Sequence, residues 1–141
     1  MRTFLAKAAT VVLVTAGSLA TGATAAQAAP TPTGRCADGW SPANVADPRT
    51  VWSKPLFGRL IELRYSNYYR CAWGRISNGS PGDRIWVDRS LDGGITWQKK
   101  SEVAIAEGRE AYTTMWKDGG VVMRACGKAG NRDDVACTGW Y

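Results

Sequence analysis

The chain has 141 residues, with 18 Lys and Arg against 12 Asp and Glu, a formal net charge of +6, and no histidine. This length fits a single domain, and a hydrophobic fraction of 45% with seven Trp excludes a wholly disordered chain. The absence of histidine excludes Ser-His-Asp and Cys-His catalysis, and it also excludes zinc sites built on histidine.

Residues 1–28 have the pattern of a secretory signal peptide. Arg2 and Lys7 precede an uncharged, mostly apolar run over residues 8–20, and Ala-Gln-Ala at 26–28 places small residues where signal peptidase cuts. The run is too short and too rich in Thr, Gly and Ser for a membrane-spanning helix. We therefore predict cleavage at the end of this segment. Cleavage removes two positive charges, lowers the formal net charge from +6 to +4, and leaves a secreted, extracellular protein without membrane attachment.

After the signal peptide, the sequence predicts a Pro-rich N-terminal arm over residues 29–55 and a β-domain over residues 56–141. The arm carries most of the chain's prolines and shows no apolar periodicity. All four cysteines lie in the exported part, and four cysteines in a small exported chain predict two disulfides.

Three pairings of the cysteines can be drawn. Cys126 and Cys137 flank a segment that looks like a hairpin connection, so they could bridge its base. Cys36 could then fasten the arm to Cys71 in a predicted strand, and this pairing is preferred. No Cys-x-x-Cys spacing is present, which excludes the usual redox and zinc-knuckle motifs.

The exported part is expected to fold as short strands. Residues 59–65 alternate Ile61 and Leu63 with Glu62 and Arg64, which is typical of a strand buried on one face. The predicted strands, in chain order, cover residues 59–65, 69–76, 84–89, 95–99, 102–106, 110–116, 121–126 and 135–140. Turn signals every 8 to 12 residues predict an all-β fold, a small antiparallel sandwich or barrel of seven to eight strands. The signal peptide is the only segment predicted to be helical.

One segment matches the pattern S-x-D-x-G-x-T-W and resembles an Asp-box. Its five defining positions are filled by Ser90, Asp92, Gly94, Thr96 and Trp97. In sialidases and other β-propellers this motif recurs once per blade, away from the active site. A single copy in a chain too short for a propeller predicts a structural role, in which the Ser and Asp side chains bond to the backbone of the turn.

A second resemblance lies in LIELRYSNYYRCAWGRI at residues 60–76 and in the closing CTGWY. On these residues the chain is similar to the YjfA-like family, small secreted proteins of Gram-positive bacteria whose function is unknown. The matching positions are Leu63, Arg64, Tyr65, Ser66, Ala72 and Trp73. The family pattern places its cysteine at the position of Tyr69, whereas this chain has Cys71, which lies on the same strand face. The resemblance implies an exported β-domain without an assigned activity.

Catalytic and metal-binding residues are not predicted. Glycoside hydrolases need two carboxylates, and Glu62 and Asp88 lie in neighbouring predicted strands. We expect each of them to pair with a nearby arginine instead, which is the usual fate of such side chains. The acidic segment 131–134 lacks the spaced ligands of a calcium loop. We therefore predict no catalytic residue, no metal and no cofactor.

Tyr68, Tyr69 and Arg70 form the candidate binding face, at the tip of a predicted hairpin. Aromatic and Arg side chains dominate binding sites for proteins, and aromatic rings also stack on sugars. The preferred function is therefore a non-catalytic extracellular binding domain for a cell-envelope glycan or a protein partner. The alternative is an inhibitor of a secreted hydrolase such as an α-amylase, and a small glycan hydrolase comes third. Nucleic acid is not expected as a partner, because the basic residues form no concentrated run.

Overall fold

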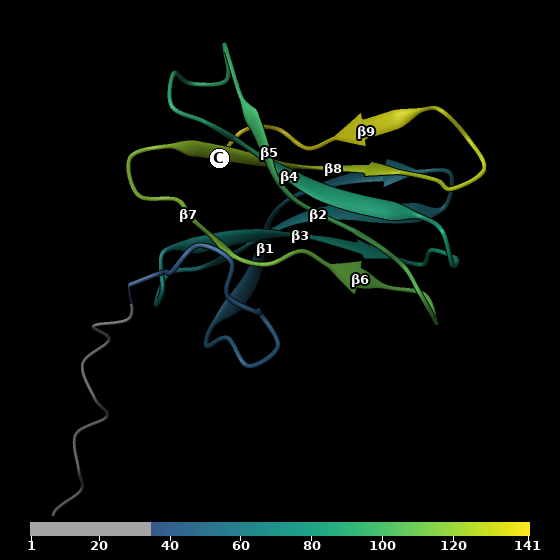
Figure 1. The fold of residues 1–141 in the computed structure, drawn as a ribbon, viewed down its shortest axis with the longest axis horizontal. Helices are drawn as coiled ribbons and strands as arrows, with labels where there is room; N and C mark the ends of the chain where they lie inside the picture. The colour runs from purple at the N-terminus through teal and green to yellow at the C-terminus, as the bar shows by residue number, and fades with distance from the viewer. Residues whose placement is uncertain (1–34) are drawn as a thin grey trace, which may run out of the picture. The chain divides into compact units, whose positions relative to one another are not determined.

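The computed structural model describes residues 35–141, and the predicted signal peptide lies outside these residues. The described part is all-β, with two antiparallel sheets that lie one above the other in Figure 1. Within it, no helix is long and apolar enough to cross a membrane. The predicted all-β fold with two disulfides is confirmed.

The first sheet has the strand order β1-β2-β3-β6, and β7 also pairs with β3. Its strands are β1 (Pro48–Leu56), β2 (Arg59–Ser66), β3 (Cys71–Ser77), β6 (Ala111–Tyr112) and β7 (Trp116–Lys117). The second sheet has the order β5-β4-β8-β9. Its strands are β4 (Arg84–Ser90), β5 (Gln98–Ala104), β8 (Val122–Lys128) and β9 (Val135–Cys137).

The core lies between the two sheets. Ile61 and Leu63 of β2 are fully buried against Ile85 and Val87 of β4 and Met123 of β8. Ile61 and Leu63, like Ile85 and Val87, are therefore alternate residues that point inward, as the period of two along the sequence predicts. The arrangement is a sandwich rather than a closed barrel, because the two sheets remain separate.

Strand β1 is the largest departure from the sequence prediction. The sequence assigned residues 48–55 to the Pro-rich arm, yet Pro48–Leu56 pairs with β2 along its whole length. The strand lies at the edge of the sheet and carries a register shift between Thr50 and Trp52. An edge strand tolerates Pro48 and Pro55 because one row of its backbone amides has no partner strand.

Two other stretches differ from the predicted strands. Residues 95–99 and 102–106 were predicted as two strands, but β5 is one strand over Gln98–Ala104. Residues 110–116 were predicted as one strand, but they divide into β6 and β7 around the buried Thr113. The hydroxyl of Thr113 accepts a hydrogen bond from the backbone amide of Gly74 at 3.0 Å, so a side chain takes the place of a ladder carbonyl at the break.

Candidate functional site

The two disulfides join Cys36 to Cys71 and Cys126 to Cys137, which is the preferred pairing. The first of them closes the end of the first sheet where β3 begins. The Cα atoms of Cys36 and Cys71 are 5.4 Å apart, and the backbone amide of Cys36 donates to the carbonyl of Tyr69 at 2.9 Å. Cys36 is thereby fixed beside the predicted binding tip.

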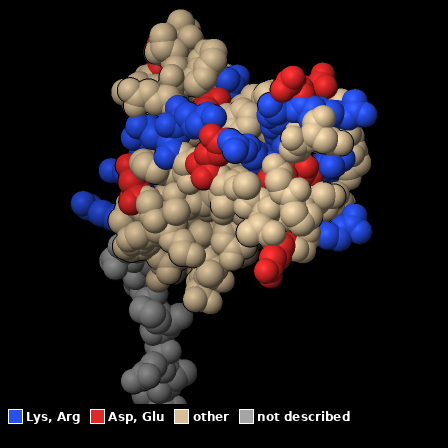
Figure 2. All heavy atoms as spheres, turned by 45° about the vertical axis from the view of Figure 1, so that its right-hand side comes forward, with Lys and Arg blue, Asp and Glu red and all other residues tan. Residues whose placement is uncertain are grey.

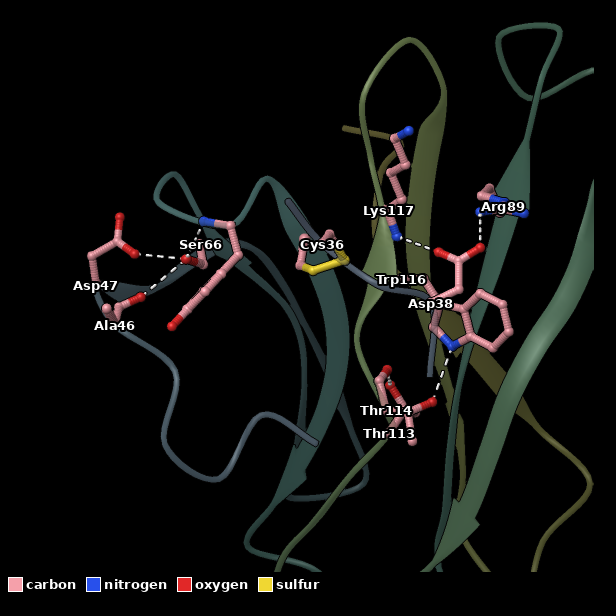
Figure 3. The surroundings of a disulfide bond; sticks show 12 residues. Cys36, Asp38, Ala46, Asp47, Ser66, Arg89, Thr113, Thr114, Trp116 and Lys117 are labelled. Atoms are coloured by element: carbon pink, nitrogen blue, oxygen red, sulfur yellow. Dashed lines mark hydrogen bonds and ion pairs between the residues drawn. A yellow bond between two sulfur atoms is a disulfide. The ribbon is translucent and has the colours of Figure 1, made fainter. Parts of the chain in front are cut away.

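The tip is a tight turn between β2 and β3, organised by Ser66. The Ser66 hydroxyl donates to Asp47 at 2.7 Å and lies 3.0 Å from the carbonyl oxygen of Ala46, and it accepts from the amide of Tyr69 at 3.2 Å (Figure 3). The turn ends on Arg70, whose φ of 55° lies in the left-handed region. That conformation favours glycine, so an arginine there is strained.

Tyr68 and Tyr69 are both half-buried and pack edge to face, with ring centroids 4.5 Å apart. Tyr69 also packs against the buried cluster of Cys71, Trp73 and Met115. Both tyrosines lie in the turn rather than in a strand, so strand alternation does not apply to them, and each ring remains partly exposed. Arg70 is exposed.

Tyr69 and Arg70 line a hollow of about 220 Å³ beside the disulfide. The remaining lining residues are Arg35, Cys36, Lys117 and Gly119. Three local features bring them together. The disulfide places Arg35 near Arg70, the β3–β7 register sets Lys117 opposite Cys71, and the amide of Asp118 donates to the carbonyl of Arg70 at 3.2 Å.

The three cations of this hollow, Arg35, Arg70 and Lys117, form no ion pair with any carboxylate among residues 35–141. The nearby carboxylate of Asp38 is already engaged. It accepts from the backbone amide of Lys117 at 2.8 Å and pairs with Arg89 at 3.1 Å, while the Lys117 side chain extends away from it (Figure 3). The hollow is therefore positively charged.

Asp118 follows Lys117 but does not neutralise this charge by an ion pair within the described part of the chain. Its buried Oδ1 has no hydrogen-bond partner there. Burial of the carboxyl group raises the pKa of Asp118 to about 7, because the charged form loses hydration without gaining a partner.

Tyr69 also lines a second, smaller hollow of about 140 Å³. This one is mostly apolar, and its walls include Trp40, Val45 and Met115. Trp40 is exposed, and its ring lies edge to face with the ring of Tyr69, with the two ring centroids 6.2 Å apart. One aromatic side chain thus borders a basic hollow and an apolar one.

The segment 90–97 forms a hydrogen-bonded turn, which projects between β4 and β5 at the top of Figure 1. The Ser90 hydroxyl donates to Asp92 at 2.7 Å and accepts from the amide of Gly94 at 2.8 Å. The Asp92 carboxylate accepts from the hydroxyl of Thr96 at 2.6 Å and from its amide at 2.8 Å. These bonds, those from Thr96 first, lower the pKa of Asp92 to about 2.

Trp97, which ends this turn, is half-exposed. The guanidinium of Arg124 lies 4.5 Å from the ring centroids of both Trp97 and Trp140. The Ser, Asp and Thr side chains of the segment therefore bond within the turn, and the indole of Trp97 packs against Arg124 of the same chain.

Glu62 and Asp88 do not form a carboxylate pair. They lie in β2 and β4, which belong to different sheets. Glu62 pairs with Arg75 at 3.3 Å and accepts from the Thr50 hydroxyl at 2.7 Å, and Asp88 pairs with Arg124 at 2.9 Å. Both carboxylates pair with arginine, as expected, but the partner of Asp88 is Arg124, 36 residues away, rather than an arginine nearby in sequence.

Another hollow, of about 470 Å³, lies on the second sheet beside Trp86. It has three cations, Arg84, Lys99 and Lys128, but each of them pairs with a carboxylate, Glu102 or Asp133. The Lys99 amine also lies 4.3 Å from the centroid of the Trp86 ring. Figure 2 shows one face of the molecule, on which acidic groups stand among a band of Lys and Arg.

Residues 28–126 match the family model described as protein of unknown function DUF2690. The chain belongs to this family. All residues that line the basic hollow lie inside the matched part of this DUF2690 chain, whereas Cys137 lies outside it. No curated protein and no solved structure matched the chain. The match confirms a family of unknown function, as expected, and the family it names is DUF2690.

Sequence reasoning found Tyr69 and Arg70 but missed Arg35 and Lys117 as partners in the same hollow. The preferred disulfide could have indicated Arg35, since a bridge between Cys36 and Cys71 brings the residues before them, Arg35 and Arg70, near each other. Lys117 depends on the pairing of β7 with β3, which no local pattern in the sequence indicates.

Proposed function

We propose that this DUF2690 chain is a secreted, non-catalytic binding domain that holds an extracellular partner at the tip formed by Tyr68, Tyr69 and Arg70. One observation carries the proposal. Three cations without carboxylate partners in the described residues meet the ring of Tyr69 around one hollow. Aromatic and Arg side chains at a preformed concave site are typical of binding hot spots. Two disulfides support the extracellular location, because they persist in oxidising compartments.

The non-catalytic role is supported by the state of the carboxylates. A glycosidase acid and its partner carboxylate face one substrate across about 5 to 9 Å. Glu62 and Asp88 belong to different sheets, and each is nearly buried and bound to arginine. A small glycan hydrolase therefore has less support than a binding domain.

The inhibitor alternative also has less support. Leu63-Arg64-Tyr65 retains two of the three residues that α-amylase inhibitors use for recognition. Leu63 stands where those inhibitors have Trp, however, and it is fully buried in the core. This chain therefore presents no aromatic side chain at that position to a partner enzyme.

Two finer assignments belong to this proposal. The resemblance to YjfA-like proteins fits an exported domain without enzymatic activity. The segment 90–97 is proposed as an Asp-box with a structural role, because its Ser, Asp and Thr side chains are spent on the turn.

Capture by isolated cell-wall material and by culture-supernatant proteins, read by mass spectrometry, tests the proposed function. The double variant Tyr68→Ala/Arg70→Gly is expected to lose capture about thirty-fold or more, since truncating a hot-spot residue costs about 2 kcal/mol. Tyr69 is left intact because it packs on the disulfide cluster.

Lys54→Gln is the matched control for this capture experiment. Lys54 is an exposed cation on β1, paired in register with Ile61 rather than with the Ser66 end of β2, so it lies about 20 Å along the strand from the tip. Its variant should capture as well as wild type. If the double variant keeps its melting temperature and its capture, the tip is only a turn and the proposal fails.

A further inference from the structure

We propose that the hollow beside the Cys36–Cys71 disulfide binds an anionic sugar unit, with Arg35, Arg70 and Lys117 holding the negative group and Tyr69 facing the sugar ring. This inference rests on the proposed binding function and names the chemical class of its ligand. The phosphate and the carboxylate of such a sugar share the same recognition chemistry, a compact anion that accepts hydrogen bonds from cations.

Convergence is the first argument. Other surface cations of the chain, such as Lys54, also lack ion pairs among residues 35–141. Here three cations line one concavity that contains no carboxylate among its lining residues. Like charges held together in a hollow repel one another, and a bound anion removes that repulsion.

Rigidity is the second argument. The disulfide holds Arg35, the amide of Asp118 holds the carbonyl of Arg70, and Asp38 holds the amide of Lys117. The backbone positions of all three cations are therefore fixed before a ligand arrives. A preorganised site loses less conformational entropy on binding than a flexible one.

The backbone of Arg70 is the third argument. Its φ of 55° is a conformation that glycine adopts freely and that a side chain makes unfavourable. Strain of this kind persists where surrounding structure enforces it, and it often accompanies a functional residue. An arginine at this position contributes a guanidinium to the hollow that glycine would not supply.

Size and the aromatic wall favour a sugar over a larger ligand. The hollow of about 220 Å³ is smaller than the roughly 300 to 1,000 Å³ of pockets for drug-sized molecules, so it fits one small unit. The half-buried ring of Tyr69 is an apolar surface of the sort that packs against sugar rings, and its hydroxyl adds a polar group.

Titration of the exported protein, followed by the NMR signals of its backbone amides, tests the ligand class. The probes are glucose 1-phosphate, glucuronate and neutral glucose. Both anionic sugars are expected to bind with dissociation constants of roughly 1 to 10 mM, with shifts at Cys36, Arg70 and Gly119, and to weaken as salt is added. The anionic probe that binds more tightly shows whether the ligand carries a phosphate or a carboxylate. Equal binding of glucose, or no shift at these amides up to about 50 mM of either anion, overturns the proposal.

Two variants locate the binding. Arg70→Gly and Lys117→Gln are each expected to weaken the binding of the anionic sugars about ten-fold, whereas Lys54→Gln leaves it unchanged. Arg70→Gly relieves backbone strain, so its melting temperature should not fall. Lys117→Gln provides a second variant whose exposed side chain contributes no packing to the core. Unchanged binding in both variants contradicts the assignment.

The titration and the capture experiment fail in different ways. If wall or protein capture is lost in Tyr68→Ala/Arg70→Gly while no anionic sugar binds, the ligand class is wrong and the proposed function stands. If both anionic sugars bind at the hollow while that variant captures as well as wild type, the ligand class stands and the proposed function is wrong.

Discussion

Removing the Cys36–Cys71 disulfide with the double variant Cys36→Ala/Cys71→Ala is expected to lower the free energy of unfolding by about 3 to 4 kcal/mol. The bridge spans a sequence separation of 35 residues, so it restricts a long loop of the unfolded chain. A domain of this size has a small core, and a loss of that magnitude is a large part of its stability.

Urea denaturation of wild type and variant measures this loss, and the second disulfide provides the control. Cys126 and Cys137 are only 11 residues apart, so their bridge restricts a shorter loop. The loss of unfolding free energy in Cys126→Ala/Cys137→Ala is expected to be about 1 kcal/mol smaller than the loss in Cys36→Ala/Cys71→Ala. Only the first double variant should also weaken the binding of anionic sugars, because only Cys36–Cys71 fixes Arg35. A larger loss of stability from the shorter bridge would contradict this account.

Asp118→Asn is expected to raise the free energy of unfolding above that of wild type, by about 1 to 2 kcal/mol more at pH 8 than at pH 5. This magnitude allows for the solvent around the half-buried side chain. Burial raises the pKa of Asp118 to about 7, above its usual value of 3.8. The folded wild type therefore binds more protons than the unfolded chain between these two values. Its stability falls as the pH rises through this range and levels off above about pH 7.

The chain has no histidine and its four cysteines are in disulfides, so few other groups titrate between pH 5 and pH 8. Urea denaturation at intervals across this range should show the downward slope in wild type and a flatter profile in Asp118→Asn. Parallel profiles for the two proteins would show that Asp118 is ionised normally in the folded state.

The strands of the sandwich that alternate apolar and polar residues could be predicted from the sequence. Ile61 and Leu63, or Ile85 and Val87, identify a buried face within a few residues, because the period of a strand is two. The disulfides followed from the short hairpin between Cys126 and Cys137, which left Cys36 for Cys71.

Strand β1 could not be predicted because its evidence is not local. Pro48 and Pro55 argue against a strand, and nearly all of its residues are exposed. Only the pairing with β2 makes it a strand, and the position at the sheet edge is what makes its prolines acceptable. The division of residues 110–116 around Thr113 likewise depends on Gly74, which lies 39 residues away.

Only part of the candidate site could be predicted, because the rest of it also depends on residues that are distant in sequence. Tyr69 and Arg70 stand out as neighbouring bulky residues in one short stretch. Arg35 and Lys117 lie far from that stretch in sequence, and only the disulfide and the β3–β7 pairing bring them to the same hollow. Composition shows an excess of basic residues but not which of them remain without carboxylate partners after folding.

A crystal structure of the protein with glucose 1-phosphate tests the central claim most directly. We expect the phosphate oxygens within hydrogen-bond distance of the side chains of Arg70 and Lys117, with the sugar ring against Tyr69 beside the Cys36–Cys71 disulfide. A phosphate bound instead in the hollow at Trp86, between Arg84 and Lys128, with the disulfide hollow empty, would contradict it.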